Sequence, residues 1–358
     1  MWLGLAQTYR KTKDAKLEER AAVRAASLGG NDPVILHGLA IFYSESEKWA
    51  EAAAFETRYA ERAPADPDAY RRAVWLHMQA GQPKRAIQLA YRGLASENQG
   101  ALRNLLGKAY AAEGQFEAAT KELQEAVRLS PYEERHHFDL AHALLLRHNF
   151  DGSLQVLEAA RKIFDKSAQI ELATGVAYYG LRRFSEAVDS FLRAATLAPD
   201  VEQPFVFLSR FLGQAEARLP EITEKLAAFR ADYPRHYLGG FLQGKALAAQ
   251  GETSGQAEAL LRESIALNDT FWESHFELGV LLESKRAWAE SAAELERAIQ
   301  LNPGNSAAHY RLARVYDRLG KPEQAAAQRA LHVKYDAEER AVVEKMATGL
   351  KRLELVVQ

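Results

Sequence analysis

The sequence has no cysteine, no long apolar run and no marked excess of charge of either sign. Without thiols the chain has no disulfides, no thiolate metal ligands and no cysteine nucleophile. No stretch approaches the roughly 18 apolar residues that a transmembrane helix needs, so no membrane insertion is expected in this segment. Because 46 basic residues stand against 48 acidic ones, a nucleic acid partner is not expected either.

The familiar signatures of catalysis are also missing. No G-x-S-x-G elbow, H-E-x-x-H helix or dinucleotide fingerprint is present. Gly239, Gly244 and Lys245 have nearly the spacing of a phosphate-binding loop, but Ala246 follows where that loop needs a serine or threonine for magnesium. The segment is also predicted to be helical. The sequence therefore predicts that the protein is not an enzyme and binds no cofactor.

Histidines gather in one short stretch. His136, Asp139 and His142 follow one another at spacings of three on one side of a predicted helix. Metal sites on helices more often use ligands at i and i+4, or ligands from several elements. We therefore expect these histidines to be solvated or to line a groove, and we predict no metal site.

The sequence does contain an internal repeat. At 358 residues the chain exceeds what one hydrophobic core usually organises, so several domains or a repeat array is expected. One clear copy of the pattern consists of Leu106, Gly107, Tyr110, Phe116, Ala119 and Pro131. Ala313 follows Gly279 by one period, and Gly175 follows Gly107 by two. The period is that of stacked helix-turn-helix units, about 34 residues.

The repeated residue types explain how such a unit packs. Small residues at Gly107 and its equivalents let a second helix approach the first closely, and glycines such as Gly114 and Gly320 suit the turn between the helices. Prolines stop the second helix before the next unit begins. These prolines are Pro64, Pro131, Pro199, Pro234 and Pro303.

The pattern resembles that of the tetratricopeptide repeat family, W-x2-L-G-x2-Y followed by A-x3-F and P. The resemblance covers nearly the whole chain. It implies an all-α fold, a right-handed superhelical solenoid of about ten helix-turn-helix repeats with a C-terminal capping helix. The units are predicted to begin near Met1, Pro33, Pro67, Gly100, Glu134, Ala168, Glu202, Tyr237, Trp272 and Ser306.

Departures from the pattern predict the domain organisation. Residues 1–201 form an array of about six repeats whose first is truncated, because Trp2 already occupies a mid-helix slot; a trimmed chain or a naturally short first helix would both explain this. Residues 202–271 hold divergent repeats seven and eight. There, Gly213 to Pro220 replaces the tight turn, and an extra residue falls near 252–256. Residues 272–335 return to regular repeats.

Residues 336–358 are predicted to form a separate capping helix that solvates the end of the array. Its apolar stripe consists of Val342, Met346, Leu350, Leu353 and Val357.

A functional surface follows from the resemblance. In this family the first helices of the repeats line a concave groove that accepts an extended segment or a helix of a partner protein. The residues projected onto that face are His37, Arg71, Trp75, Asn104, Lys108, Arg135, Phe138, His142, Tyr179, Arg210, Phe241, Lys245, Tyr310 and Arg314. Aromatic and arginine side chains often dominate binding energy, and a basic groove would steer an acidic partner. For each aromatic residue, packing between neighbouring helices is the alternative.

The main interpretation is thus a scaffold or adaptor that binds a protein or peptide. Two alternatives stay open: a regulatory arm of a larger enzyme or membrane-anchored protein, and a repeat protein that self-associates. The compartment is not determined by the sequence. Either the cytoplasm or, after removal of a preceding signal, an exported location such as the periplasm is compatible with it.

Overall fold

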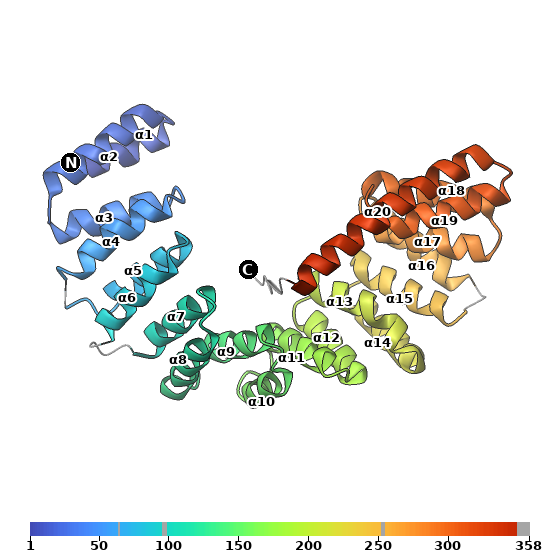
Figure 1. Cartoon of the computed structure of the whole chain (residues 1–358), viewed down its shortest axis with the longest axis horizontal. Coiled ribbons are helices and arrows are strands. Elements are labelled where there is room, and N and C mark those ends of the chain that lie inside the picture. Colours follow the sequence, from blue (N-terminus) through green and yellow to red (C-terminus); the bar gives the residue numbers. More distant parts are fainter. Residues whose placement is uncertain (64, 95–98, 252–254, 349–358) are drawn as a thin grey trace. The chain divides into compact units, whose positions relative to one another are not determined.

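The computed structural model describes residues 1–63, 65–94, 99–251 and 255–348, with side chains up to residue 341 (Figure 1). Within these ranges the regular elements are twenty α-helices and two short 3₁₀ helices, with no strand. Pro64, residues 252–254 and the predicted cap residues Leu350, Leu353 and Val357 lie outside the described residues. The same holds for the side chains of Val342 and Met346.

The chain divides into two compact units, Met1–Asp165 and Lys166–Gln358. The first unit is a stack of five helix pairs, each joined by a short turn (Figure 1). Its helices are α1 (Trp2–Lys11), α2 (Ala15–Gly29), α3 (Pro33–Ser44), α4 (Trp49–Ala60), α5 (Ala69–Gln79), α6 (Pro83–Gly93), α7 (Gln99–Ala112), α8 (Phe116–Leu129), α9 (Glu134–Leu146) and α10 (Phe150–Arg161).

The second unit also consists of five repeats. Its helices are α11 (Ala168–Gly180), α12 (Phe184–Leu197), α13 (Gln203–Phe211), α14 (Leu219–Asp232), α15 (Tyr237–Ala249), α16 (Gln256–Leu267), α17 (Trp272–Ser284), α18 (Trp288–Leu301), α19 (Ser306–Arg318) and α20 (Pro322–Thr348). The predicted repeat starts are confirmed to within two positions in both units. The proposed division of the array at residues 201 and 271 stays a prediction.

Local sequence explains several of the helix starts. The side chains of Asp32, Ser167 and Asn305 each accept a hydrogen bond from a backbone N–H in the first turn of α3, α11 and α19. Such caps satisfy donors that a helix start otherwise leaves unpaired. The described ends also agree with the prolines, because α8 ends at Leu129 and α18 at Leu301, shortly before Pro131 and Pro303.

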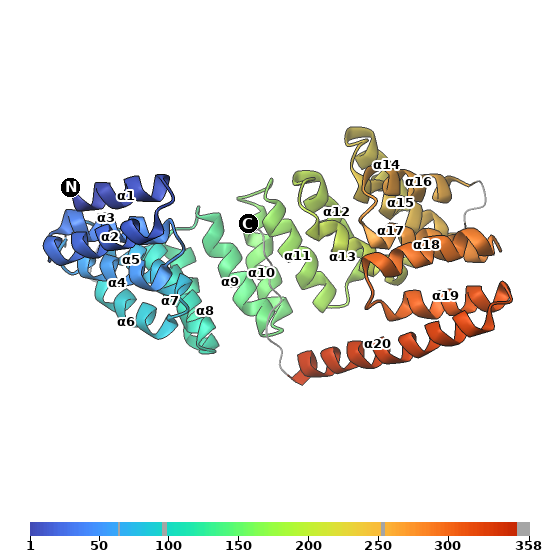
Figure 2. The same ribbon diagram turned by 90° about the horizontal axis from the view of Figure 1, so that it is seen from above.

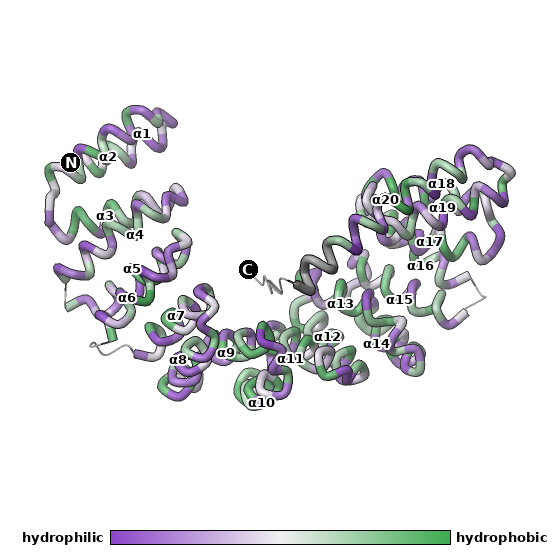
Figure 3. Tube along the Cα trace, in the orientation of Figure 1, coloured by the Kyte–Doolittle hydropathy of each residue, from purple (hydrophilic) through white to green (hydrophobic). Residues whose placement is uncertain are grey.

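Small residues bring the two helices of a repeat together, as the pattern predicted. A Cβ placed on Gly107 would lie 2.6 Å from the Leu123 Cγ and 3.0 Å from the Ala119 carbonyl oxygen, so nothing larger than hydrogen fits there. Gly279 faces Leu295 in the same way. Apolar and polar positions alternate along most helices in Figure 3, which is the amphipathic pattern of helices that bury one face.

The turn inside nearly every repeat contains one residue in the left-handed region. Glycines occupy this place at Gly81, Gly114, Gly251 and Gly320, with φ between 66° and 74°. The same place in other repeats carries a residue with a Cβ, at a φ between 55° and 60°. These residues are Lys13, Glu47, His148, Arg182 and Arg286. The left-handed turn is therefore a requirement of the repeat geometry, and not of glycine alone.

The seventh repeat departs from this design. Two 3₁₀ helices, Leu212–Gln214 and Glu216–Arg218, replace the tight turn between α13 and α14. The backbones of α13 and α14 do not pack closely, although the rings of Phe205 and Phe229 meet at 5.3 Å. Both rings are largely buried, so they contribute to the contact between the two helices.

The predicted separate capping helix is wrong in one respect. The second helix of repeat ten does not end near residue 335 but continues as α20 to Thr348, 27 residues in all. Figure 2 shows α20 running alongside α19 and extending past its end. The carboxylate of Glu339 accepts hydrogen bonds from the backbone N–H and the Oγ of Ser306, at the start of α19. The residues around 335 include no proline or glycine, so nothing breaks the helix there.

Gly279→Ala should destabilise the second unit, because the new methyl group meets Leu295 Cγ at 2.7 Å. Gly4→Ala is the matched control, since a Cβ on Gly4 of α1 has open space. Both changes gain the same helix propensity, so the difference between them isolates the clash. Overpacking of this kind costs about 1–3 kcal/mol. Thermal unfolding, monitored by circular dichroism, should give Gly279→Ala a clearly lower melting temperature than Gly4→Ala. Equal melting temperatures would contradict the helix-pair model.

Arg286→Gly should raise stability by about 0.5–1 kcal/mol, because a left-handed conformation costs a residue with a Cβ about 1–2 kcal/mol and glycine's extra chain entropy offsets only part of this. Gly320→Ala, in the equivalent turn, should lower stability by a similar amount. Urea unfolding of both variants measures the two effects, which are expected to have opposite signs.

Candidate functional site

The first helices of repeats three to five, α5, α7 and α9, lie next to one another in the N-terminal unit. Trp75, Lys108 and His142 occupy equivalent positions in these helices, so they form one row across the unit. The Trp75 side chain is 43% exposed and packs edge to face on Trp49, with ring centroids 5.8 Å apart. A large aromatic surface therefore stands at one end of the row.

Asp139 connects two of the basic residues that the sequence placed on this face. Its Oδ2 lies 3.4 Å from Lys108 Nζ and 3.3 Å from Arg135 Nε. Asp139 itself is buried, whereas the Arg135 side chain is 62% exposed. One carboxylate is thus shared by two cations, which leaves this part of the face with one uncompensated positive charge.

Asn104 lies one helical turn before Lys108 on α7 and is almost fully buried. Its amide nitrogen Nδ2 has no hydrogen-bond acceptor among the residues that the structure describes. An unsatisfied buried donor costs about 1–3 kcal/mol, so such a group is uncommon unless an acceptor arrives from outside. Because Nδ2 itself has almost no accessible surface, a carbonyl or carboxylate oxygen from outside reaches it only after the Asn104 side chain turns toward the surface.

Other predicted residues of this unit have partners within the fold. His37 Nδ1 lies 2.8 Å from Glu56 Oε2, and its ring stacks on Tyr59. Arg71 forms an exposed ion pair with Asp68, the residue just before α5. Phe138 is 5% exposed and stacks on His142, so it contributes to the core and offers no surface to a partner.

The C-terminal unit places the remaining predicted residues on α11, α13, α15 and α19. Tyr179 is 38% exposed, and its ring stacks on Phe211 with centroids 4.1 Å apart. Arg210 and Tyr310 are exposed on α13 and α19. Phe241, in contrast, is 1% exposed; its ring meets Phe271 edge to face, so packing explains it fully.

Two of the predicted basic residues of this unit, Lys245 and Arg314, are paired with carboxylates of a neighbouring repeat. Lys245 Nζ lies 2.7 Å from Glu277 Oε1 and donates a hydrogen bond to Ser209 Oγ. Glu283 accepts from both Arg311 and Arg314, at 3.0 and 3.3 Å. Lys245 and Glu277 are equivalent in the repeat to Lys108 and Asp139. Lys245 is therefore neutralised by a carboxylate of its own, whereas Arg311 and Arg314 share the single carboxylate of Glu283, as Lys108 and Arg135 share that of Asp139.

Two motifs that resembled chemical sites are structural. The segment from Gly239 to Lys245 lies inside α15, and Gly244 packs against Leu261 and the Ala257 carbonyl, so it forms no phosphate-binding loop. His136 is buried and contacts the Ala126 carbonyl oxygen at 3.2 Å; burial lowers the pKa of its imidazole. Of the two alternatives expected for these histidines, solvated or groove-lining, the first is wrong for His136. No cluster of three metal-ligating side chains occurs in the described part of the chain.

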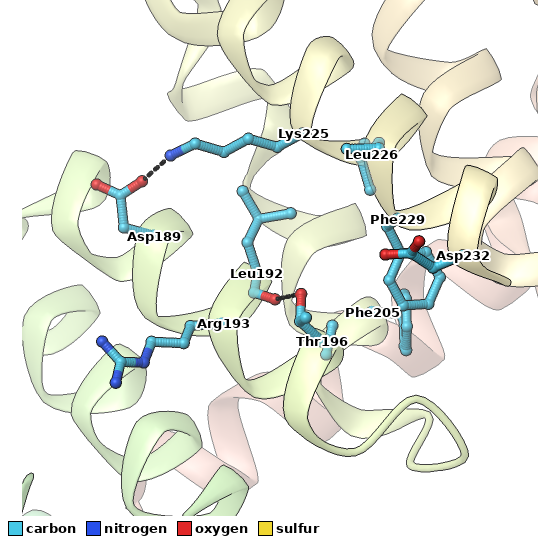
Figure 4. Close-up of a pocket in the computed structure, with 11 residues that line it drawn as sticks. Asp189, Leu192, Arg193, Thr196, Phe205, Lys225, Leu226, Phe229 and Asp232 are labelled. Atoms are coloured by element: carbon cyan, nitrogen blue, oxygen red, sulfur yellow. Dashed lines mark hydrogen bonds and ion pairs between the residues drawn. The ribbon is translucent and has the colours of Figure 1, made fainter. Parts of the chain in front are cut away.

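A pocket of about 470 Å³ opens between α12 and α14, beside the irregular seventh repeat (Figure 4). Its inner wall is formed by Leu192, Phe205, Leu226 and Phe229, all largely buried. Charged and polar residues surround the opening. These residues are Asp189, Arg193, Thr196, Lys225 and Asp232.

An ion network fixes one end of this pocket. Arg218 reaches Asp189 at 2.9 Å and Glu221 at 2.7 Å, while Lys225 lies 2.9 Å from each of these carboxylates. Hydrogen bonds from Arg218 and Lys225 lower the pKa of Glu221 to about 2. Burial raises the pKa of Asp189, but hydrogen bonds from the same two cations outweigh it, so the pKa is lowered overall. This network ties α14 to α12.

Some of these features were not found from the sequence. The pairing of Lys108 with Asp139 and of Lys245 with Glu277 has a signal, because in both pairs the acid follows the cation by almost one full repeat. For the pocket, the sequence contained only an indirect signal, which was the irregular segment from Gly213 to Pro220. In the described part of the chain, no helix is both long enough and apolar enough to cross a membrane.

Asp189→Asn should lower stability by up to about 1 kcal/mol at pH 6, a range typical of partly exposed ion pairs. A carboxyl whose pKa is lowered on folding stabilises the fold above its unfolded pKa of about 4, and this contribution is lost as the pH falls. The difference in free energy of unfolding between variant and wild type should therefore become smaller from pH 6 to pH 3. Urea unfolding at each pH measures it, with Asp200→Asn as an exposed control. A gap independent of pH would exclude the network as its cause.

Comparisons with known proteins agree with this architecture. Models described as tetratricopeptide repeat match residues 101–133, 138–202, 241–306 and 281–345, together more than half of the chain. The unmatched stretch between 202 and 241 contains the irregular seventh repeat. No curated protein matches the chain.

Among solved structures, the C-terminal part of a TPR repeat-containing protein from Cytophaga hutchinsonii is 17% identical, with a TM-score of 0.52 over 76% of this chain and 98% of that one. Yeast Tom70 is 13% identical, with a TM-score of 0.43 over 96% of both chains. YrrB, described as a TPR protein with an unusual peptide-binding site, is 22% identical, with a TM-score of 0.39 over 51% of this chain and 95% of that one. The repeat geometry and the family models lead to one conclusion: the chain belongs to the tetratricopeptide repeat family.

Proposed function

We propose that this protein is an interaction scaffold that binds an acidic, extended segment of a partner protein on the first-helix face of its N-terminal unit. Asn104 carries the proposal. It is a nearly buried donor without an acceptor, one helical turn from Lys108 and on the same side of α7. A backbone carbonyl or carboxylate of the partner would satisfy it, and the partner rather than the fold would then supply the missing hydrogen bond.

The charges around Asn104 favour an acidic partner. Lys108 and Arg135 share the single carboxylate of Asp139, so a second carboxylate has two cations within reach. Charge-assisted hydrogen bonds of this kind are roughly twice as strong as neutral ones. Complementary charge also increases the association rate and disfavours basic competitors.

Trp75 supplies the apolar part of the site. Its exposed indole lies in the same row as Lys108, one repeat away, and packs edge to face on Trp49. Partly buried aromatic rings held in this way are common anchors in protein interfaces. The face therefore combines an aromatic anchor, a hydrogen-bond donor and a net positive charge within three adjacent repeats.

A direct test selects peptides from a random display library on the full chain and measures each by fluorescence anisotropy. Selected peptides should be rich in Asp and Glu. Lys108→Ala and Trp75→Ala should each weaken binding about tenfold, which corresponds to 1.4 kcal/mol. Asn104→Leu should also weaken binding while leaving thermal stability unchanged or raised, because it removes an unsatisfied buried donor.

Lys84→Ala is the matched control, since Lys84 is exposed on α6, a second helix of the same unit. It should bind like the wild type. The proposal is wrong if no peptide is retained, or if the selected peptides bind Lys108→Ala and Lys84→Ala equally well.

A further inference from the structure

The pocket between α12 and α14 lies on second helices, away from the first-helix face. We propose that it is a separate binding site that accepts an arginine side chain from a partner protein. Its volume of about 470 Å³ is within the range of roughly 300–1,000 Å³ that is usual for ligand sites. This proposal does not depend on the function assigned to the N-terminal unit.

The walls of the pocket suit the stem and the plane of an arginine. Leu192 and Leu226 form the inner wall together with Phe205 and Phe229, whose rings meet each other (Figure 4). An arginine covers apolar surface with its methylene stem while its head group stays in a polar environment. Its guanidinium also stacks on aromatic rings more readily than an ammonium does.

The two ends of the pocket differ in charge. At one end Asp189 and Lys225 pair with each other, so that end offers no net charge to a ligand. The other end is formed by Thr196 and Asp232, each two helical turns further along its helix, or about 10 Å. The carboxylate of Asp232 forms no ion pair or hydrogen bond with any residue that the structure describes. It is the free acid of the pocket.

Helix orientation adds to this negative charge. α12 ends at Leu197 and α14 at Asp232, so the C-terminal ends of both helices flank the Thr196 and Asp232 end of the pocket. A helix C-terminus carries a partial negative charge. Arg193, the nearby cation on the rim, is held by Glu171 at 3.0 Å. The free charge is therefore negative, which attracts a cationic group and disfavours a carboxylate.

Arginine fits better than lysine because its planar head group can donate two parallel hydrogen bonds to the Asp232 carboxylate. Charge complementarity at this end, with the apolar wall behind it, points to an arginine carried by a protein segment that lies across α12 and α14.

The absence of cysteine makes a direct test possible. Thr196→Cys introduces a single thiol at the rim of the pocket. This variant is equilibrated with the symmetric disulfide of 3-mercaptopropylguanidine or, separately, with that of the neutral 3-mercaptopropylurea, so that thiol–disulfide exchange attaches one probe and releases the other half as a thiol, against increasing 2-mercaptoethanol. Intact mass spectrometry gives the concentration of 2-mercaptoethanol that displaces half of each probe. The guanidine disulfide should resist about tenfold more reductant than the urea disulfide.

Gln300→Cys is the matched control, because Gln300 is exposed at the equivalent position of α18 in a regular repeat. At that position, the same concentration of 2-mercaptoethanol should displace half of each probe. Adding Asp232→Asn to Thr196→Cys should abolish the preference for guanidine. The proposal is overturned if the same concentration of 2-mercaptoethanol displaces half of each probe from the Thr196→Cys variant. It is also overturned if the preference for guanidine persists after Asp232→Asn is added.

Discussion

Two helix backbones can approach closely only where neither carries a large side chain, and every regular repeat of this protein depends on that limit. At Gly107 and Gly279 the facing leucines leave room for a hydrogen atom and nothing more. Each repeat packs only on its neighbours. Loss of this close contact in one repeat therefore changes the packing of that repeat without unfolding the array. Repeat seven shows such a local departure: two 3₁₀ helices replace its tight turn, the rings of Phe205 and Phe229 meet between its helices, and a pocket lies beside them.

The period of the sequence pattern predicted the helices and their starts, because small residues, prolines and turn glycines all recur with it. It did not predict that Lys13, Glu47, His148, Arg182 and Arg286 adopt the glycine-like turn conformation, since there the surrounding repeat overrides local preference. Nor did it predict the continuous α20. The end of a periodic pattern signals the end of repeat packing, but not the end of a helix.

The candidate site was harder to predict, because a position on the first-helix face says little about exposure. Phe138 and Phe241 share that face with Trp75 and Tyr179, yet the first two are buried and the others are not. Phe241 meets Phe271 at the start of the next repeat, whereas Phe138 stacks on His142 of its own helix, and neither contact can be read from a position on the face. The charge of the face was equally hard to predict: Lys245 is basic in the sequence, but the carboxylate of Glu277 in the next repeat neutralises it, and Arg314 shares Glu283 with Arg311.

The shared carboxylate of Asp139 has a consequence for any ligand of the N-terminal unit. Asp139 already restrains Lys108 and Arg135, so their side chains lose little conformational freedom when a ligand arrives. The same contact makes binding an exchange of partners, since an incoming carboxylate must compete with a resident one that also joins α7 to α9. Ligand binding to this face and the stability of the contact between α7 and α9 are therefore linked. A ligand that binds both cations in place of Asp139 would weaken that contact, whereas one that bridges them without displacing Asp139 would strengthen it.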